Sequence, residues 1–281
     1  MSSRDESLNA FLAVDDTIAI AEVVRTRGSV PRETGTFMLV SASAMHGTIG
    51  GGQLEYMAID KARQMLAGRL RDDRIILDIP LGPEIGQCCG GRVEIAIRLV
   101  TDAIKTELLK AAETEAAAMP HIYVFGGGHV GQALAGALSL LPMRTMIVET
   151  RAEALEGMPL CVETMLTAVP EDIVRGAPAG AAFIVLTHDH ALDFLIVAEA
   201  LKRDDAAYVG MIGSKTKKAT FRTWFVKSAG GSEAQFARLV SPIGGDAVKD
   251  KRPAVIAALA AAEVMTALAA FQRATASASV R

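Results

Sequence analysis

The sequence predicts an α/β protein in which a smaller N-terminal α+β domain precedes a larger domain built on a parallel sheet. The chain has 281 residues, which is enough for two domains of ordinary size. An apolar strand, a glycine turn and the start of a helix follow one another in the segment 121–131, HIYVFGGGHVG. From there to the C-terminus, short apolar runs alternate with helical patterns, which is typical of a parallel sheet covered by helices.

The glycine turn has the spacing G-x-G-x-x-G of dinucleotide-binding, or Rossmann, turns. Gly126 would allow the tight turn, Gly128 would let a pyrophosphate approach the backbone, and Gly131 would let helix and strand pack closely. Glu149 ends the next apolar run, where such domains place a carboxylate for the ribose hydroxyls. We therefore expect a Rossmann-like domain with these residues and His129 at a cofactor site. A tight turn that binds nothing is the alternative.

Periodicity and composition divide the chain into three parts. We place the N-terminal α+β domain at 1–100, a helical connector rich in Ala, Glu and Lys at 101–120, and the Rossmann-like domain at 121–281. The first domain is expected to hold a helix over 6–15, strands over 17–25, 36–40 and 71–81, a helix after residue 52, and a strand ending near residue 100. The second is expected to hold strands over 121–126, 144–149, 182–187 and 206–212 and helices over 129–141, 191–203, 214–228 and 253–272.

Composition narrows the class of protein. The net charge of −3 provides no basic field for nucleic acid or for an anionic membrane. The N-terminus has early charges and no apolar core, so we expect no signal peptide and a cytoplasmic protein. Three cysteines, two of them adjacent, do not make a disulfide framework.

The longest apolar run, 255–271, is rich in Ala and carries Glu263. It is slightly short for a membrane span, so we interpret it as a buried or subunit-packing helix. A homodimer is the expectation that follows, because small apolar residues allow close helix packing.

The segment Cys88-Cys89-Gly90-Gly91 is the stretch of the first domain that most suggests chemistry. A cysteine beside glycines has exposed sulfur and nearby amide N–H groups, which favour the thiolate. A thiolate could attack, accept sulfur or ligate a soft metal centre. The spacing does not fit structural zinc. The alternative is a pair of small buried residues at the start of a strand.

A second glycine run precedes a helix at Gly50, Gly51 and Gly52. Such a run can cradle an anion, or it can simply provide the unusual backbone angles of a helix entry. Gln53 and Glu55 follow at the helix start and could bind a polar heterocycle. Glu55 could equally stabilise the helix through its dipole.

Two further junctions lie after predicted strands. Thr187 to Asp193, THDHALD, partly resembles the H-x-H-x-D-H signature of binuclear metallohydrolases, but Asp193 comes one place late and the third histidine is missing. We therefore favour His188 as a ligand contact and Asp189 as a contact or a helix cap.

In the second junction, Ser214 and Lys215 open a helix with three lysines in its first turns. Lysines there oppose the helix dipole, which makes sense if an anion lies between them. A solvated basic face is the alternative.

Taken together, these motifs resemble the XdhC/CoxI family, the accessory proteins that mature xanthine dehydrogenase and related molybdenum hydroxylases. The motifs that carry the resemblance cover nearly the whole chain in order: TRGSVPRETGTFML (26–39), GTIGGGQLE (47–55), GQCCGGRVE (86–94), VFGGGHVGQAL (124–134), LTHDHALD (186–193), YVGMIGSKTKKATF (208–221) and SPIGG…KRPAVIAALAAAEV (241–264). The last segment departs from the R-T-P-A-E-I-A run that family members often show.

The resemblance implies a chaperone for the molybdenum cofactor, with no turnover of its own. Such a protein would bind molybdopterin while a cysteine desulfurase replaces an oxo ligand with the terminal sulfido ligand, then deliver the cofactor to apo-xanthine dehydrogenase. Gln87, Cys88 and Cys89 match the family's cysteine motif, and the two cysteines would hold or protect the cofactor, in possible contact with Mo. Gln53 and Glu55 would be second contacts to the pterin.

The role of the Rossmann glycines stays open at this point, because they could bind the phosphate of the cofactor or a separate nucleotide. The main alternative to the chaperone is an NAD(P)-dependent oxidoreductase that uses the Rossmann domain, with Glu149 favouring NAD through the ribose hydroxyls.

Overall fold

The computed structural model describes residues 3–14, 17–70, 72–83, 86 and 90–279. The chain forms two compact units, Met1–Ala117 and Ala118–Arg281, and each is described by itself. The predicted site residues Gln87, Cys88 and Cys89 lie outside the described residues.

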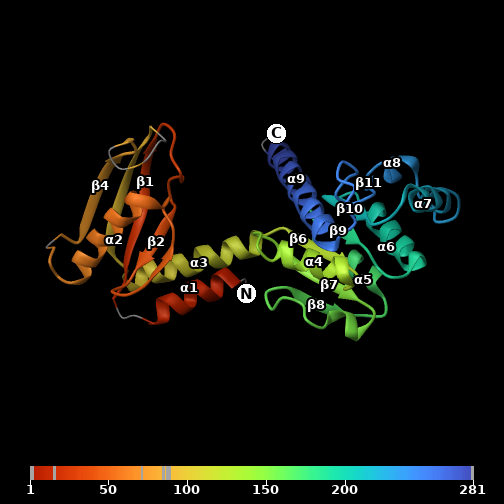
Figure 1. Ribbon diagram of the computed structural model, residues 1–281, viewed down its shortest axis with the longest axis horizontal. Helices are drawn as coiled ribbons and strands as arrows, with labels where there is room; N and C mark the ends of the chain where they lie inside the picture. The colour runs from red at the N-terminus through yellow and green to blue at the C-terminus, as the bar shows by residue number, and fades with distance from the viewer. Residues whose placement is uncertain (1–2, 15–16, 71, 84–85, 87–89, 280–281) are drawn as a thin grey trace. The chain divides into compact units, whose positions relative to one another are not determined.

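The first unit is an antiparallel sheet with helices on both faces (Figure 1). The strand order is β3-β2-β1-β5-β4. Its elements are α1 (Ser3–Val14), β1 (Ala19–Arg27), β2 (Phe37–Val40), β3 (Met45–Gly47), α2 (Gly52–Leu66), β4 (Arg74–Pro80), β5 (Arg92–Leu99) and α3 (Asp102–Ala118).

Alternation along the strands separates the two faces of this sheet. One face buries residues such as Val23, Ile95 and Ile97 against Leu54 and Ala58 of α2. The opposite face buries a smaller cluster under α1, together with apolar side chains of α3. Because that cluster lies at the start of β1 and the end of β5, the other half of this face stays exposed.

The second unit is a six-stranded parallel sheet of order β11-β10-β9-β6-β7-β8. The chain enters at β6, builds β7 and β8 on one side, and then returns to build β9, β10 and β11 on the other. Its elements are β6 (His121–Phe125), α4 (His129–Leu138), β7 (Arg144–Glu149), η2 (Ala152–Leu155), β8 (Glu163–Leu166), α5 (Pro170–Gly176), β9 (Ala182–Val185), α6 (His190–Lys202), β10 (Tyr208–Met211), α7 (Lys215–Lys227), α8 (Glu233–Phe236), β11 (Leu239–Val240) and α9 (Pro253–Ser279).

Helices cover both faces of the parallel sheet, as Figure 1 shows. One core lies under α5, α6 and α7 and contains Phe183, Phe221 and Phe225. The other lies under α4 and α9 and contains Leu134 and Val264. The predicted fold class is thereby confirmed, and the four predicted strands and four predicted helices of this domain are present. The sequence interpretation missed the short elements β8, α5 and β11.

Helix α9 is long and apolar enough to cross a membrane by length and composition alone, which is weak support for a span. Its inner face, however, belongs to the core of the unit through Ala257, Ala260 and Val264. Its one acidic side chain, Glu263, accepts hydrogen bonds from the Tyr208 hydroxyl at 2.8 Å and from the Gly244 amide at 2.7 Å. Glu263 therefore joins α9 to the sheet and to the loop that follows β11.

Candidate functional site

The glycine turn after β6 requires glycine at two of its three motif positions. A Cβ at Gly126, which has φ of 118°, would lie 2.5 Å from the Leu186 carbonyl oxygen beyond β9. A Cβ at Gly131 would lie 2.0 Å from the carbonyl oxygen of Gly126. Gly128, in contrast, is exposed and a Cβ there would meet nothing within 4 Å. The first and third glycines thus serve packing, and the second leaves open space.

This turn lies at the point where the order of the sheet reverses. β6 pairs with β7 on one side and with β9 on the other. Open parallel sheets bind ligands at the carboxyl ends of two such strands. Gly128 precedes α4 and provides no side-chain hydrogen bond, so the first-turn N–H groups of α4 beside His129 lie at this end of the sheet without a side-chain cap.

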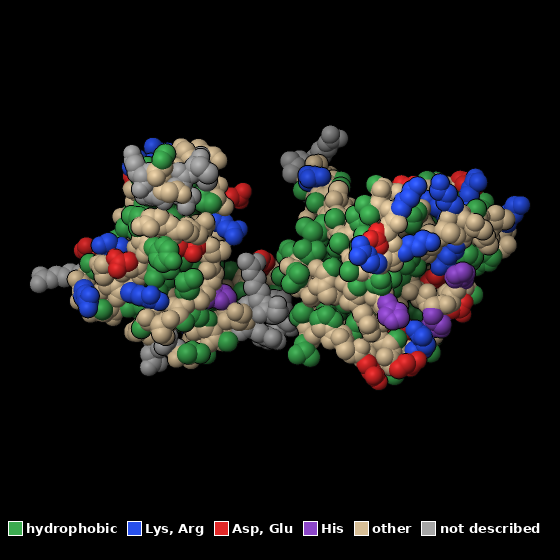
Figure 2. Space-filling view, in the orientation of Figure 1, with side chains coloured by type: hydrophobic (Ala, Val, Ile, Leu, Met, Phe, Trp, Pro, Cys, Tyr) green, Lys and Arg blue, Asp and Glu red, His purple; other side chains and the backbone are tan. Residues whose placement is uncertain are grey.

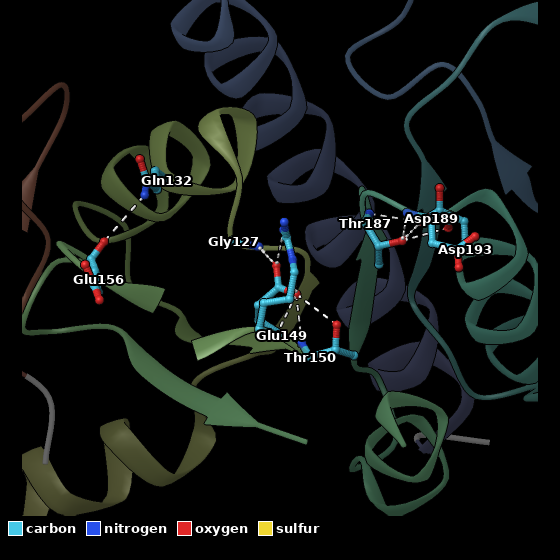
Figure 3. Close-up of polar contacts among 9 residues, drawn as sticks. Gly127, Gln132, Glu149, Thr150, Glu156, Thr187, Asp189 and Asp193 are labelled. Carbon is cyan, nitrogen blue, oxygen red and sulfur yellow. Dashed lines mark hydrogen bonds and ion pairs between the residues drawn. The ribbon is translucent and has the colours of Figure 1, made fainter. Parts of the chain in front are cut away.

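Glu149 holds the turn against the end of β7 (Figure 3). Its buried carboxylate accepts hydrogen bonds from the amides of Gly127 at 2.9 Å, Thr150 at 2.8 Å and Arg151 at 3.2 Å. The Arg151 guanidinium also donates to it, at 3.2 Å from Nη2 to Oε2. Burial raises the pKa of Glu149, but the hydrogen bonds from Arg151, Gly127 and Thr150 outweigh burial and lower the pKa to about 2.

The predicted ribose contact of Glu149 therefore competes with partners from the same chain. A ribose hydroxyl would have to share a carboxylate that already has backbone and guanidinium donors. The role is still a prediction, but the observed task of Glu149 is to fix the glycine turn.

Asp193 organises the histidine segment after β9. In the sequence analysis this residue entered only as a departure from the metallohydrolase signature. Asp193 is fully buried, and its carboxylate accepts the Thr187 amide at 2.9 Å and lies 2.7 Å from the Thr187 hydroxyl. Lys217 of α7 forms an ion pair with Asp193 and donates to the Ile212 carbonyl at 3.0 Å. These contacts join the loops after β9 and β10.

The other predicted site residues of these two junctions either cap a helix or are exposed. Asp189 accepts the Ala191 amide at 2.8 Å and caps α6, as one of the two predictions for it stated (Figure 3). His188 is exposed. Within the described ranges, no three His, Cys, Asp or Glu side chains are grouped as a metal site would need.

Ser214 caps α7 by accepting the Lys217 amide at 3.2 Å, and Lys215 is exposed. Lys217 is used by Asp193, and Lys218 donates to the carbonyls of Leu239 and Ser241. The three lysines thus do not surround one anion, and only Lys215 is left to solvent. Figure 2 shows the basic side chains spread over α7 and α8 on this face.

The first unit carries the second candidate site, at the end of β1 and the start of α2. Glu55 accepts hydrogen bonds from the consecutive amides of Ile49 at 3.0 Å, Gly50 at 3.3 Å and Gly51 at 2.9 Å, and from the Thr48 hydroxyl. Burial raises the pKa of Glu55, but these hydrogen bonds outweigh burial and lower it. The amides predicted to cradle an anion are therefore already filled by a carboxylate of the chain.

The loop after β1 brings the two glycine motifs of this unit together. A Cβ at Gly91 would lie 2.1 Å from the Ser29 carbonyl oxygen, and a Cβ at Gly50 would lie 2.7 Å from Pro31. The Gly90 amide donates to the Leu81 carbonyl at 3.0 Å, which fixes the entry into β5. The loop from Gly28 to Pro31 thus packs on both motifs.

Open space remains beside these contacts. A Cβ at Gly51, Gly86 or Gly90 would meet no atom of the described residues within 4 Å. Gly52 and Gln53 are exposed at the start of α2, and the Tyr56 side chain is 71% exposed one turn further on. Helical side chains lean toward the N-terminus of the helix, which is the direction of Gly52 and Gln53 from Tyr56.

Comparison with known proteins identifies the family of the chain. Residues 122–264 match the XdhC Rossmann domain, and residues 12–76 match the XdhC and CoxI family. The chain belongs to the XdhC family. The Rossmann match contains the glycine turn and Glu149, and the other match contains Gly50 to Glu55. The cysteine segment lies between the two matched ranges.

Two individual proteins extend this result. The XdhC-family chain is 26% identical over 260 residues to YqeB of Escherichia coli K12, an uncharacterized protein. The aligned part is 88% of this chain and 43% of YqeB, so the chain spans less than half the length of that relative. A solved structure named as a xanthine dehydrogenase from Bacillus halodurans has a TM-score of 0.77, 17% identity and 96% coverage of both chains, which shows a shared fold.

The buried ion pair gives a prediction for stability. Replacing Lys217 with Met leaves the Asp193 carboxylate buried without its cation, which typically costs about 3–5 kcal/mol. We expect K217M to lower the free energy of urea unfolding by an amount in this range, and K215M, at the exposed neighbour, to change it by less than ~0.5 kcal/mol. The double variant K217M/D193L should recover part of the loss. Equal stability of K217M and K215M would contradict the assignment.

The lowered pKa of Glu149 gives a prediction for pH dependence. The folded-state pKa of about 2 lies below the ordinary value of 4.5, so the stabilisation is present above pH 4.5 and is lost as the pH falls toward 2. We expect E149Q to be less stable than the natural chain by on the order of 2–3 kcal/mol at pH 7, with the difference vanishing near pH 2. Denaturant titrations across this range measure it, with E153Q as the exposed control. A difference that does not depend on pH would refute this role.

Proposed function

We propose that this XdhC-family chain binds the molybdenum cofactor in its molybdopterin form, supports sulfuration by a cysteine desulfurase and delivers the cofactor to apo-xanthine dehydrogenase. The observation that carries the proposal is that glycines leave the backbone uncovered by side chains at one end of the first unit. Gly51, Gly86 and Gly90 leave space there for a bulky planar group to approach the backbone. Family membership supports an accessory role of this kind.

The residues present fit a pterin cofactor. The exposed Gln53 amide has both donors and acceptors for the edge of a heterocycle, and the Tyr56 ring provides a face on which it can stack. When bound, the cofactor supplies the molybdenum centre whose oxo ligand is exchanged for sulfur. Cys88 and Cys89 would provide soft sulfur ligands or shield that centre from water. Glu55 keeps the loop of Gly50 and Gly51 in one conformation through its amide hydrogen bonds.

The partners belong to the same proposal. Exposed glycine backbone at one end of the unit would allow transfer of the cofactor to xanthine dehydrogenase, and Cys88 and Cys89 would face the desulfurase. We further propose a homodimer that packs through α9, because Figure 2 shows apolar side chains along this helix. The proposed setting is the cytoplasm, with neither nucleic acid nor membrane as a partner.

The cysteine assignment has a direct test. After incubation with molybdopterin and removal of unbound cofactor, the retained pterin is oxidised and measured by fluorescence. We expect C88A and C89A each to retain several-fold less pterin than the natural chain, because each removes a soft ligand. The matched control is C161A, since Cys161 is an exposed free cysteine of the second unit. Unchanged retention in both variants would refute the role of the cysteines.

A second candidate function is an NAD(P)-dependent oxidoreductase. The observation that favours it is the uncapped start of α4 at the reversal point of the parallel sheet, where dinucleotides bind. The partners that already occupy Glu149 count against it.

Titration with NADH separates the two functions. The oxidoreductase predicts saturable enhancement of NADH fluorescence at or below roughly millimolar NADH, the range of ordinary enzyme–substrate affinities. No binding at that concentration would eliminate this function. Pterin retention together with no NADH binding is the result that the chaperone predicts.

A further inference from the structure

Two arginines face each other at the open end of the first sheet. In the antiparallel register of β1 and β5, Arg27 lies directly opposite Arg92, and both side chains are exposed. Directly opposed residues have their Cβ atoms about 4.5–5.5 Å apart, and like charges in such a pair destabilise the sheet. The pair therefore needs negative charge nearby.

The carboxylates of this face satisfy only part of that need. Asp78 of β4 binds Arg92 through two parallel hydrogen bonds, of 2.5 Å to Nε and 2.7 Å to Nη2. Glu94 of β5 pairs with Arg25 at 3.5 Å. Among the residues that the structure describes, no hydrogen bond or ion pair involves the side chain of Arg27. The arginines Arg25 and Arg92 thus each have a carboxylate as ion-pair partner, and the guanidinium of Arg27 has none among the described residues.

The position of Arg27 connects it to the cofactor site. Arg27 is the last residue of β1, and its carbonyl oxygen would lie 2.7 Å from a Cβ at Gly91. The loop that begins at Gly28 then packs on Gly91 and Gly50. Arg27 consequently ends at the same edge as the glycine motifs. Its neighbour Thr26 pairs with Val93, which packs on the α2 side, so the Arg27 side chain lies on the opposite face and would reach the part of a ligand that extends past this edge.

The other anion site at this end is already filled. Glu55 accepts the amides of Ile49, Gly50 and Gly51, so a phosphate would have to displace a carboxylate to reach them. A guanidinium, by comparison, presents a planar fork of N–H donors that matches two phosphate oxygens at once.

We propose that Arg27 binds the phosphate monoester of the pterin cofactor. This inference rests on the proposed function and names the residue that recognises the charged end of the ligand. The guanidinium donates to two phosphate oxygens, and the negative charge of the phosphate offsets the repulsion between Arg27 and Arg92. Without ligand, Asp78 is the carboxylate whose charge acts on both Arg92 and Arg27, and its hydrogen bonds go to Arg92.

The test compares two forms of one ligand with the full-length chain. The probes are the oxidised, fluorescent pterin derivative with its phosphate and the same derivative after treatment with phosphatase. Fluorescence anisotropy gives both dissociation constants. A charge-assisted hydrogen-bond pair predicts that the natural chain prefers the phosphorylated probe by roughly 10-fold or more. Inorganic phosphate at millimolar concentration serves as competitor and shows whether free phosphate alone fills the site.

The variants assign the preference to one residue. R27Q should reduce the preference to within about 2-fold and leave binding of the dephosphorylated probe unchanged, because only the phosphate contact is lost. R27K keeps the charge without the planar fork and should give an intermediate preference. R25Q is the matched control, since Arg25 lies on the same face but pairs with Glu94, and it should keep the preference. R27Q should unfold at the same or a higher urea concentration than the natural chain, because one of two opposed charges is gone.

The outcomes separate this inference from the proposed function. Equal binding of the two probes by the natural chain would overturn the role of Arg27 and leave cofactor binding intact. If R25Q loses the preference for the phosphorylated probe to the same degree as R27Q, the preference comes from the charge of the whole face. That result would overturn the role of Arg27. Failure of the natural chain to bind either probe would overturn both proposals.

Discussion

Backbone amides in glycine turns need acceptors, and in each unit a glutamate of the same chain provides them. Glu55 accepts three consecutive amides at the start of α2, and Glu149 accepts the amide of Gly127 together with two amides after β7. Hydrogen bonds to these amides lower the pKa of both carboxylates below the ordinary glutamate value of 4.5. The two candidate sites are therefore held in shape before any ligand binds, at the cost of amides that a ligand could have used.

This constraint changes where ligands can be recognised. With the backbone amides of 49–51 filled, the groups that the first unit offers at this place are exposed side chains and glycine backbone. The proposed cofactor site accordingly uses Gln53 for hydrogen bonds, Tyr56 for an aromatic face and Arg27 for positive charge. In the second unit, the amides at the start of α4 have no side-chain cap and are available to a ligand. Glu149 already accepts hydrogen bonds from the turn, and Lys217 is paired with Asp193.

Much of this architecture could be predicted from the sequence. Apolar periodicity located the strands and helices of the parallel sheet, and the glycine spacing located its reversal point. Family membership, which the motifs indicated, is confirmed. The strands β9 and β10 have four residues each and were found because all of their residues are buried in an apolar run, whereas β11 has two residues, too few to show any periodicity. All four residues of β8 are exposed, so no alternation of burial marks it.

The contacts that decide the sites were harder to predict. Glu55 and Glu149 were expected to contact ligands, but a carboxylate beside a glycine run fits a ligand contact and a backbone acceptor equally well. The pair of Asp193 and Lys217 joins residues far apart in sequence, and only the parallel order of β9 and β10 brings them together. The local sequence feature that pointed to this pair was Asp193, a charged residue among the apolar residues of α6. The opposition of Arg27 and Arg92 depends on strand register, which a single sequence does not specify.

The measurement that tests the central claim most directly is the molybdenum and pterin content of the full-length chain. The chain is incubated with the intact cofactor, separated from unbound cofactor by gel filtration, and analysed by elemental mass spectrometry and pterin fluorescence. Cofactor binding predicts that molybdenum and pterin elute with the protein in equal amounts. Protein that elutes free of both, while a known cofactor-binding protein retains them under the same conditions, would contradict the proposed function.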